Sequence, residues 1–401
     1  MNTTKTTLAL LASVATLGYA SAATAGSGCA GINCADGNGN VAESIQEGTG
    51  QGLHIRQTGV KNVVDTYQGG SYNNLYVSQT GYNNGSWIHQ YGTSNTMEQV
   101  VEGDNNNVYM NQGSNTQPPG NGVWYPGGDV TANYNTATVT IKGSDNVVAT
   151  NQAGDFHTTH NDVTGNWNTV YVEQVDSGHT ASTTINGDLN NTSIKQSGVD
   201  QTATIVANGD NNNLTIEQAN LANTAVIDVT GNDYVIETLQ DGQYNLASIT
   251  ITDPSGTATN GVSIEQQGDH NSGTINTRGT YNQAHILQVG NGNRSYIGQT
   301  GTNNNAGSAV LGNNNEHDII QGGSGNRALI ASVGDGNDGD LNQENTWDSY
   351  ADITQFGDCN TGYVFQAGDN HYADITQSGF GNIATLDQMG TGHRALIRQN
   401  R

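Results

Sequence analysis

The chain has 401 residues and a formal net charge of −25 at pH 7; only 33% of its residues are hydrophobic, whereas 54 are Gly. This is too little apolar material for the core of an ordinary globular protein of such length. The strong negative charge repels nucleic acid and anionic lipid, so we expect neither as a partner.

Residues 1–25 predict a secretory signal peptide. Lys5 gives a short positive region, residues 8–18 form an apolar run too short to span a bilayer, and Ala23-Thr24-Ala25 offers a cleavage site of small residues. No later stretch is apolar enough to cross a membrane, so we expect export without membrane insertion.

Residues 26–39 form a Gly/Asn-rich N-terminal segment. It contains Cys29 and Cys34, which are close enough for a small-loop disulfide in an oxidising compartment, whereas Cys359 stands alone in a predicted turn. Three cysteines cannot hold together a chain of this length, and no second Cys/His pair completes a zinc-like set. We therefore expect the stability to come from the repeat that follows.

Residues 40–401 carry an eleven-residue repeat. Its 31 units place Gln at a marker position in 21 units, Gly two residues later in 25, and Asn six residues earlier in 23. Each unit of such a repeat must bury its apolar side chains against its neighbours, which leaves little of the chain for catalysis. The predicted ladder residues, which stack on their equivalents, include Gln46, Gln57, Gln68, Gln79, Gln90, Gln355, Gln366, Gln377, Gln388, Gln399, Asn62, Asn73, Asn84, Asn360 and Asn382. The predicted turn residues include Gly48, Gly59, Gly70, Gly81, Gly357, Gly368, Gly379 and Gly390.

Within one unit the period of the pattern is two. Asn73, Leu75, Val77 and Gln79 share the inward face and the residues between them face outward, which is the alternation of a β-strand. Outward aromatic residues, which could contact partners, are Tyr67, Tyr76, Tyr109 and Tyr171.

The repeats in residues 141–251 predict two strands per coil. Gln returns there every 22 residues and an apolar residue fills the intervening marker position, as in Gln152, Val163 and Gln174. A coil of two strands puts the Gln column in one sheet and the apolar column in the facing sheet. The predicted fold is therefore all-β: a cross-β solenoid of stacked 22-residue strand-turn-strand coils, about fifteen in number, around a thin apolar core.

Two insertions and one phase shift interrupt the repeat. Three prolines fall in the segment 113–134, and Asp253-Pro254 opens the segment 253–259. Because Pro cannot donate to a strand ladder, both segments are predicted to loop out of a solenoid that resumes after each of them. The phase also shifts by one residue near Asn345.

Other polar groups give weaker signals. An acidic turn is compatible with a calcium loop or with ordinary turn chemistry; its residues are Asp335, Asn337, Asp338 and Asp340. Four histidines occupy Asn positions of the repeat and are interpreted as ladder substitutes: His157, His179, His371 and His393. No nucleophile–base pair is identifiable, so we expect no enzyme activity, no cofactor and no metal.

The end of the chain resembles a known family. Ser349-x5-Gln355-x4-Asn360-x5-Gln366 has the spacing of curlin repeats, and the run from Ala373 to Ala384 is also similar to them. The resemblance extends over roughly residues 40–401. It implies a secreted subunit that polymerises into the cross-β curli amyloid fibres of the biofilm matrix. It also implies a curli-type nucleator and an outer-membrane secretion channel as partners, with the segment 26–39 as the address for that channel.

Three classes of function follow from these patterns. The leading hypothesis is an extracellular structural subunit at the bacterial cell surface, which assembles head-to-tail into fimbria-like fibres and supports adhesion and aggregation. The alternative is a monomeric extracellular β-solenoid binding protein of the adhesin or ice-binding type. A carbohydrate-active β-helix enzyme would need paired carboxylates on one face, and no convincing pair is present.

Overall fold

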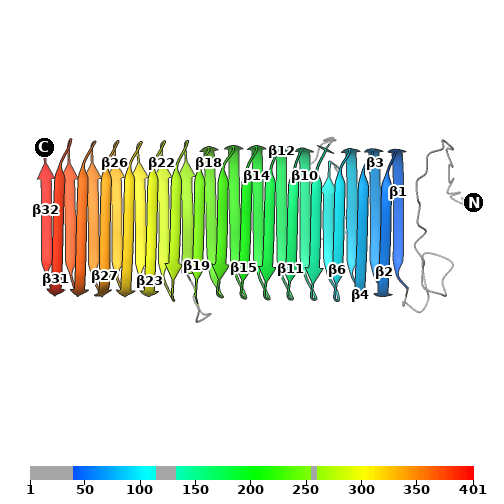
Figure 1. Cartoon of the computed structure of the whole chain (residues 1–401), viewed down its shortest axis with the longest axis horizontal. Helices are drawn as coiled ribbons and strands as arrows, with labels where there is room; N and C mark the ends of the chain where they lie inside the picture. The colour runs from blue at the N-terminus through cyan, green and yellow to red at the C-terminus, as the bar shows by residue number, and fades with distance from the viewer. Residues whose placement is uncertain (1–38, 114–131, 254–259) are drawn as a thin grey trace, which may run out of the picture.

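The computed structural model describes residues 39–113, 132–253 and 260–401, and these form one long two-sheet rod. Figure 1 shows the strands in chain order along its long axis, from β1 at one end to β32 at the other. The described residues contain strands and turns but no helix, so none of them forms a helix that could span a membrane. The predicted signal peptide, the segment 26–39 up to residue 38, and most of both insertions lie outside the described residues.

Every strand pairs in parallel with the strand one coil away, which gives two sheets. The 17-stranded sheet contains β1 (Val41–Thr49), β3 (Val63–Ser71), β5 (Gly85–Thr93), β7 (Asn107–Gln112), β8 (Ala132–Asn133), β10 (Val147–Asp155), β12 (Thr169–Ser177), β14 (Asn191–Val199), β16 (Asn213–Leu221), β18 (Tyr234–Gln243), β20 (Asn260–Gln267), β22 (Gln283–Val289), β24 (Asn305–Leu311), β26 (Arg327–Val333), β28 (Tyr350–Phe356), β30 (Tyr372–Ser378) and β32 (Arg394–Asn400).

The 15-stranded sheet contains β2 (Gly52–Val60), β4 (Asn74–Tyr82), β6 (Thr96–Glu102), β9 (Thr136–Lys142), β11 (Thr158–Thr164), β13 (Thr180–Asn186), β15 (Thr202–Asn208), β17 (Thr224–Thr230), β19 (Leu246–Thr252), β21 (Ser272–Arg278), β23 (Arg294–Thr302), β25 (Glu316–Ser324), β27 (Asp338–Trp347), β29 (Thr361–Asp369) and β31 (Ile383–Thr391). The predicted β-solenoid of about fifteen two-strand coils is thereby confirmed.

The pairing register is 22 residues along most of the rod. Gln196 lies beside Gln218 in one sheet, and Ile205 lies beside Ile227 in the other. The inward faces of both sheets meet in one continuous apolar core of Ala, Val, Ile and Leu, which includes Ile194, Ile216 and Ile227. The alternation of inward and outward residues seen in the sequence therefore sets the burial along each strand.

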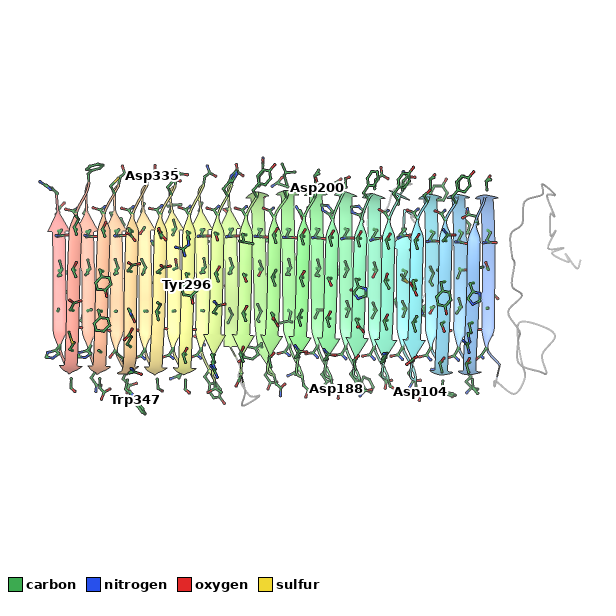
Figure 2. All side chains as sticks on the ribbon, in the orientation of Figure 1. Asp104, Asp188, Asp200, Tyr296, Asp335 and Trp347 are labelled. Atoms are coloured by element: carbon green, nitrogen blue, oxygen red, sulfur yellow. The ribbon has the colours of Figure 1, made fainter. Side chains whose placement is uncertain are left out.

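The turns contain two left-handed residues each. In the turn after β4, Gly81 has a φ of +128° and Asn83 has a φ of +58°. A Cβ on Gly81 would lie 1.9 Å from the carbonyl oxygen of Gly103 in the next coil, so the stacking itself requires glycine there. Figure 2 shows the turn residues Asp200 and Asp335 at one edge of the rod and Asp104, Asp188 and Trp347 at the other.

The register changes at the three predicted interruptions. Gln112 bonds Gln152, which is 40 residues later, and Gln240 bonds Gln266, which is 26 residues later. Near Asn345 the pairing of β27 with β29 shifts between Glu344 and Trp347, so one extra residue forms a bulge at the end of β27. The coils on either side of each change keep their stacking.

The prediction that Tyr109 is available for contact with a partner is wrong, because its side chain is buried. Only 6% of Tyr109 is exposed, and the Trp87 ring stacks on it at 4.9 Å between centroids. Tyr76 remains exposed, and Tyr67 and Tyr171 are partly buried.

Candidate functional site: amide ladders and open ends

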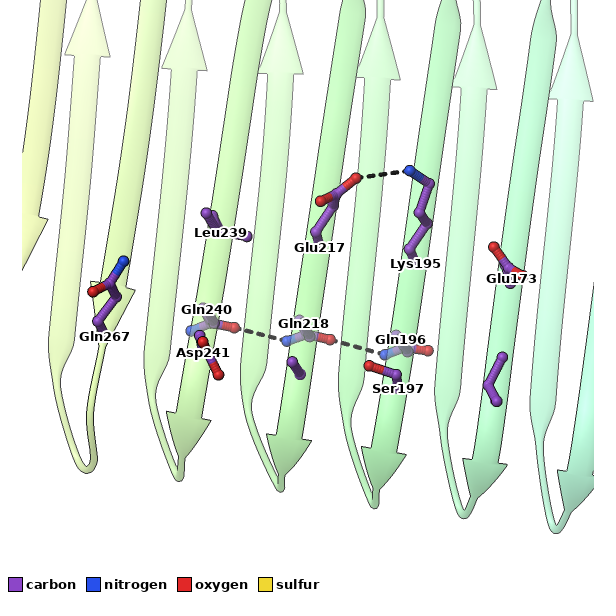
Figure 3. Close-up of a pocket in the computed structure, with 12 residues that line it drawn as sticks. Glu173, Lys195, Gln196, Ser197, Glu217, Gln218, Leu239, Gln240, Asp241 and Gln267 are labelled. Carbon is purple, nitrogen blue, oxygen red and sulfur yellow. Dashed lines mark hydrogen bonds and ion pairs between the residues drawn. The ribbon is translucent and has the colours of Figure 1, made fainter. Parts of the chain in front are cut away.

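The inward Gln side chains form hydrogen-bonded columns along the rod. Each Gln Nε2 donates to Oε1 of the Gln in the next coil toward the C-terminus, at 2.9 Å from Gln196 to Gln218 and 2.8 Å from Gln218 to Gln240 (Figure 3). The longest column lies in the 17-stranded sheet and contains Gln46, Gln68, Gln90, Gln112, Gln152, Gln174, Gln196, Gln218, Gln240, Gln266 and Gln288. A second column there contains Gln355, Gln377 and Gln399. The 15-stranded sheet has one column of Gln57 and Gln79 and another of Gln299, Gln321, Gln343, Gln366 and Gln388.

Each Gln amide also ties its sheet to the facing one. Gln218 Nε2 donates to the carbonyl oxygen of Thr202 at 3.1 Å, and Gln377 Nε2 donates to that of Thr361 at 2.9 Å. The acceptor is the first residue of the preceding strand, which lies in the other sheet. Both amide hydrogens are thereby used, which removes most of the cost of burying the amide.

The inward Asn side chains form columns that run in the opposite sense. Asn84 donates from its backbone N–H and from Nδ2 to Oδ1 of Asn62, the preceding coil, at 3.1 and 3.0 Å. The same Nδ2 reaches the carbonyl oxygen of Gly103 in the following coil at 2.7 Å. The Asn side chains therefore provide hydrogen-bond partners for backbone N–H and carbonyl groups at the turns.

The burial of the predicted ladder residues depends on how far they lie from the ends of the rod. Fully buried or nearly so are Gln68, Gln79, Gln90, Gln355, Gln366, Gln377, Gln388, Asn62, Asn73, Asn84, Asn360 and Asn382. In the end coils Gln46 is exposed, and Gln57 and Gln399 are partly buried. The predicted turn glycines all have φ between +97° and +128°: Gly48, Gly59, Gly70, Gly81, Gly357, Gly368, Gly379 and Gly390.

Histidines continue the Asn columns where Asn is replaced. His157 and His179 stack at 5.1 Å between ring centroids, and the His179 N–H donates to Nδ1 of His157 at 3.3 Å. Nε2 of His157 then carries the hydrogen and donates to the carbonyl oxygen of Ala153 at 3.3 Å. Burial, followed by the neighbouring His179, lowers the pKa of His157 to about 4, so the ring is neutral at pH 7.

A chain of buried polar side chains, which the repeat pattern does not predict, crosses the core near the C-terminal third. Both ring nitrogens of His317 contact serines, Nδ1 with Ser308 Oγ at 2.9 Å and Nε2 with Ser332 Oγ at 2.7 Å, and Ser332 donates to Gln355 Oε1 at 2.8 Å. Burial lowers the pKa of His317 to about 3. The sequence pattern could have indicated that His317 is buried, because it lies two residues after the ladder residue Asn315 and so on the same inward face.

Carboxylates gather on the outer face of β25 and β27. Burial, then Asp338, Asp318 and Glu316, raise the pKa of Asp340 to about 6. The four residues of the calcium hypothesis are not brought together: Asp335 lies in a turn and accepts from Asn313, Asn337 is buried in an Asn column, and Asp338 and Asp340 lie on β27. The described residues contain no group of three or more His, Cys, Asp or Glu placed to hold a metal.

A shallow groove lies on the outer face of the 17-stranded sheet (Figure 3). Its walls include Glu173, Leu239 and the ion pair of Lys195 with Glu217, whose Nζ and Oε1 are 2.8 Å apart. Half-exposed side chains from successive coils form it. This lining has no arrangement of nucleophile and base, and we assign the groove no chemistry.

Both ends of the rod present unpaired strand edges among the described residues. β1 and β2 pair only with β3 and β4, and β31 and β32 pair only with β29 and β30. The apolar side chains that are fully buried in interior coils are only partly buried there, namely Ala42, Leu53, Ile55, Ala395 and Ile397. Open edges of this kind recruit further strands.

Comparison with protein families finds a match in the C-terminal coils. The model of the curlin associated repeat matches residues 312–344, 348–379 and 372–400. Among curated proteins, none matches the chain at a significant level. The matched residues span β25 to β32 and contain the Gln, Asn and Gly positions described above. In its C-terminal coils the chain is thus similar to the curlin associated repeat.

Proposed function

We propose that this chain is a secreted structural subunit that assembles head-to-tail into curli-like amyloid fibres at the bacterial cell surface. The observation that carries the proposal is that, among the described residues, both ends of the rod have unpaired strands, partly buried apolar side chains and a Gln column that stops. A second copy stacked on either end would bury those side chains and extend the columns. The curlin associated repeats in residues 312–400 support the same function.

The proposal includes the role and location of the fibre. The fibres belong to the extracellular biofilm matrix, where they support adhesion and aggregation, and the chain is not an enzyme. Residues 1–25 direct export and 26–39 address an outer-membrane secretion channel, as the curlin resemblance implies. A curli-type nucleator starts the fibres, and neither nucleic acid nor membrane insertion takes part.

Fibre growth of residues 26–401 tests the proposal. The net charge of −25 for the chain opposes stacking, so growth should quicken as the pH falls toward the pI of about 4.3 or as salt screens the surface. Dye binding follows growth, and fibre diffraction should show the cross-β spacings of about 4.7 and 10 Å. A chain that stays monomeric at low pH and high salt, with seeds present, would refute self-assembly.

A matched pair of variants separates end stacking from general surface effects. Ile397 faces the core of the last strand and is partly buried, whereas its neighbour Leu396 faces outward. Ile397→Lys should slow growth strongly, because a second copy would bury the charge without a partner. Leu396→Lys places the same charge outside the junction and should leave the growth rate within a few-fold of wild type. Equal slowing by both would contradict growth through the strand ends.

One observation favours the alternative of a monomeric binding protein. Six Thr side chains stack in one outward column of the 15-stranded sheet, at Thr96, Thr136, Thr158, Thr180, Thr202 and Thr224. A regular hydroxyl column suits an ordered ligand surface such as ice or a polysaccharide. Thr180→Lys, at the centre of the column, should abolish inhibition of ice recrystallisation under this alternative and leave fibre growth intact under the first.

A further inference from the structure

The described residues form an odd number of strand rows. β7 and β8 lie in one row, because both pair with β5, at Gly85–Gln90 and at Gly92–Thr93 respectively. The 17 segments of the first sheet therefore make sixteen rows, against 15 in the facing sheet. As a result β1 and β32, the first and last strands of the described residues, lie in the same sheet.

Successive rows alternate between the sheets and are linked in that order. Gln388 on β31 donates to the carbonyl oxygen of Tyr372 on β30 at 3.1 Å, and Gln399 on β32 donates to that of Ile383 on β31 at 2.8 Å. Each Gln thus contacts the strand that precedes it on the facing sheet. The row that follows β32 must accordingly lie in the sheet of β31, directly on β31.

From this parity we propose that each subunit in a fibre is turned by half a turn about the long axis relative to its neighbour. β1 of the second copy pairs with β31 of the first, and β2 pairs with β32. The 17-stranded sheet of one copy then continues into the 15-stranded sheet of the next, and the two sheets exchange at every junction. The inference rests on the proposed self-assembly and adds its geometry.

The side chains at the two ends fit this turned junction in register. Gln46 stacks on Gln388 and Gln57 stacks on Gln399, so both Gln columns continue in the sense found inside the rod. In the turned junction Asn40 of the second copy stacks on Asn382 of the first, so an Asn column also continues.

The remaining ladder position at the junction pairs Gln51 with His393. The same pair already occurs within the chain, where the Gln201 N–H donates to Nδ1 of His179 at 3.2 Å. Every ladder contact of the turned junction therefore has a counterpart in the interior of the rod.

An unturned junction would pair β1 with β32 and leave one row of the facing sheet empty between β31 and β2. Charge favours that arrangement, because it places Asp387 near Arg56, whereas the turned junction places Arg56 beside Arg398. These side chains are exposed, and exposed pairs contribute little. An empty row instead leaves the backbone groups and the inward amide of β31 without partners, which costs far more. The turned junction is therefore favoured, and added salt should tighten it.

Disulfide trapping in fibres distinguishes the two junctions. The variants carry Cys29→Ser, Cys34→Ser and Cys359→Asn, so that only the introduced thiols react. In the turned junction Ile45 lies beside Asp387, and in the unturned junction it lies beside Arg398. Paired strands lie about 4.8 Å apart, which is within disulfide reach. Oxidised fibres of Ile45→Cys/Asp387→Cys should give covalent ladders on a non-reducing gel, and those of Ile45→Cys/Arg398→Cys should give at least tenfold less.

The reverse ratio, or fibres in which neither pair links, would overturn the inference. Fibres of the unaltered chain provide a second measurement that does not depend on the cysteine variants. Helical reconstruction should show each sheet continuing into the other sheet of the next subunit, with an axial rise of roughly 73 Å per subunit for fifteen and a half coils. Continuous sheets of one kind would also overturn it. If the unaltered chain forms no fibres at all, the proposed function itself fails.

Discussion

The energetic weight of the Gln columns can be measured at Gln218 in the middle of the rod. Gln218→Ala removes three hydrogen bonds: acceptance from Gln196 at 2.9 Å, donation to Gln240 at 2.8 Å and donation to the Thr202 carbonyl at 3.1 Å. Gln196 keeps its second acceptor, the carbonyl oxygen of Thr180 at 3.1 Å, so its amide is partly compensated. Oε1 of Gln240 loses its ladder donor while it remains buried.

The expected loss follows from these contacts. A buried group left unsatisfied costs about 1–3 kcal/mol, and the small cavity left by the shortened side chain adds about 1 kcal/mol. The opening free energy of the surrounding coils should therefore fall by about 2–4 kcal/mol. Because 1.4 kcal/mol is a factor of ten, this corresponds to roughly 30- to 700-fold more frequent opening.

The neighbouring residue supplies the control. Glu217 lies on the same strand but on the outer face, where it pairs with Lys195 and has a side chain that is 40% exposed. Glu217→Ala should cost about 0–1 kcal/mol, as exposed ion pairs do. Figure 3 shows both interactions, the amide column and the ion pair, on the same strands.

Hydrogen exchange measured by mass spectrometry on monomeric chain is the suitable assay, because a rod of stacked coils opens locally. Protection should fall in peptides that cover β14, β16 and β18 for Gln218→Ala and stay near wild type for Glu217→Ala. Equal protection in the two variants would refute the assignment of stability to the amide column.

Three further outcomes are expected. Gly334→Ala should destabilise the rod much more than Gly336→Ala in the same turn, judged by the denaturant midpoint, since a Cβ on Gly334 would lie 2.2 Å from the Gly357 carbonyl oxygen, whereas on Gly336 the nearest atom is 3.6 Å away. The pKa of His157 is about 4 in the folded chain and about 6.5 in the unfolded chain, so as the pH falls the unfolded chain binds the proton first. The free energy of unfolding should therefore fall by about 3 kcal/mol between pH 6.5 and pH 4. His157→Asn should remove this pH dependence of local hydrogen exchange. The pKa of Asp340 is raised to about 6, so its charge opposes folding at pH 7 and the penalty is relieved as the pH falls below 6; Asp340→Asn should raise the denaturant midpoint at pH 7 and change little at pH 4.

The fold could be predicted from the sequence because its period and its alternation determine it. The spacing of Gln152 and Gln174 gives the coil, and the apolar marker Val163 between them gives the facing sheet. A strand whose inward and outward residues alternate so regularly has only one register that buries the apolar set.

Details that depend on neighbouring coils could not be predicted from one unit. The ring partner of Tyr109 is Trp87, which lies 22 residues earlier on the neighbouring strand. The partners of His317 come from Ser308 and Ser332 on facing strands, and the repeat pattern treats all three as ordinary inward positions. The exposure of Gln46 depends on its place in the first coil and not on its place in the motif.

The opposite senses of the Gln and Asn columns have an electrical consequence for a long fibre. Each amide carries a dipole of about 3.5 D, and a column of aligned amides adds its dipoles as a helix does. In this rod each ladder Gln donates to the Gln of the following coil, whereas each ladder Asn donates one N–H to the Asn of the preceding coil and the other to a carbonyl of the following coil. The Asn bonds to the preceding coil therefore offset part of the Gln dipole in every coil that contains both, so a lengthening fibre accumulates less side-chain dipole than the Gln columns alone would give.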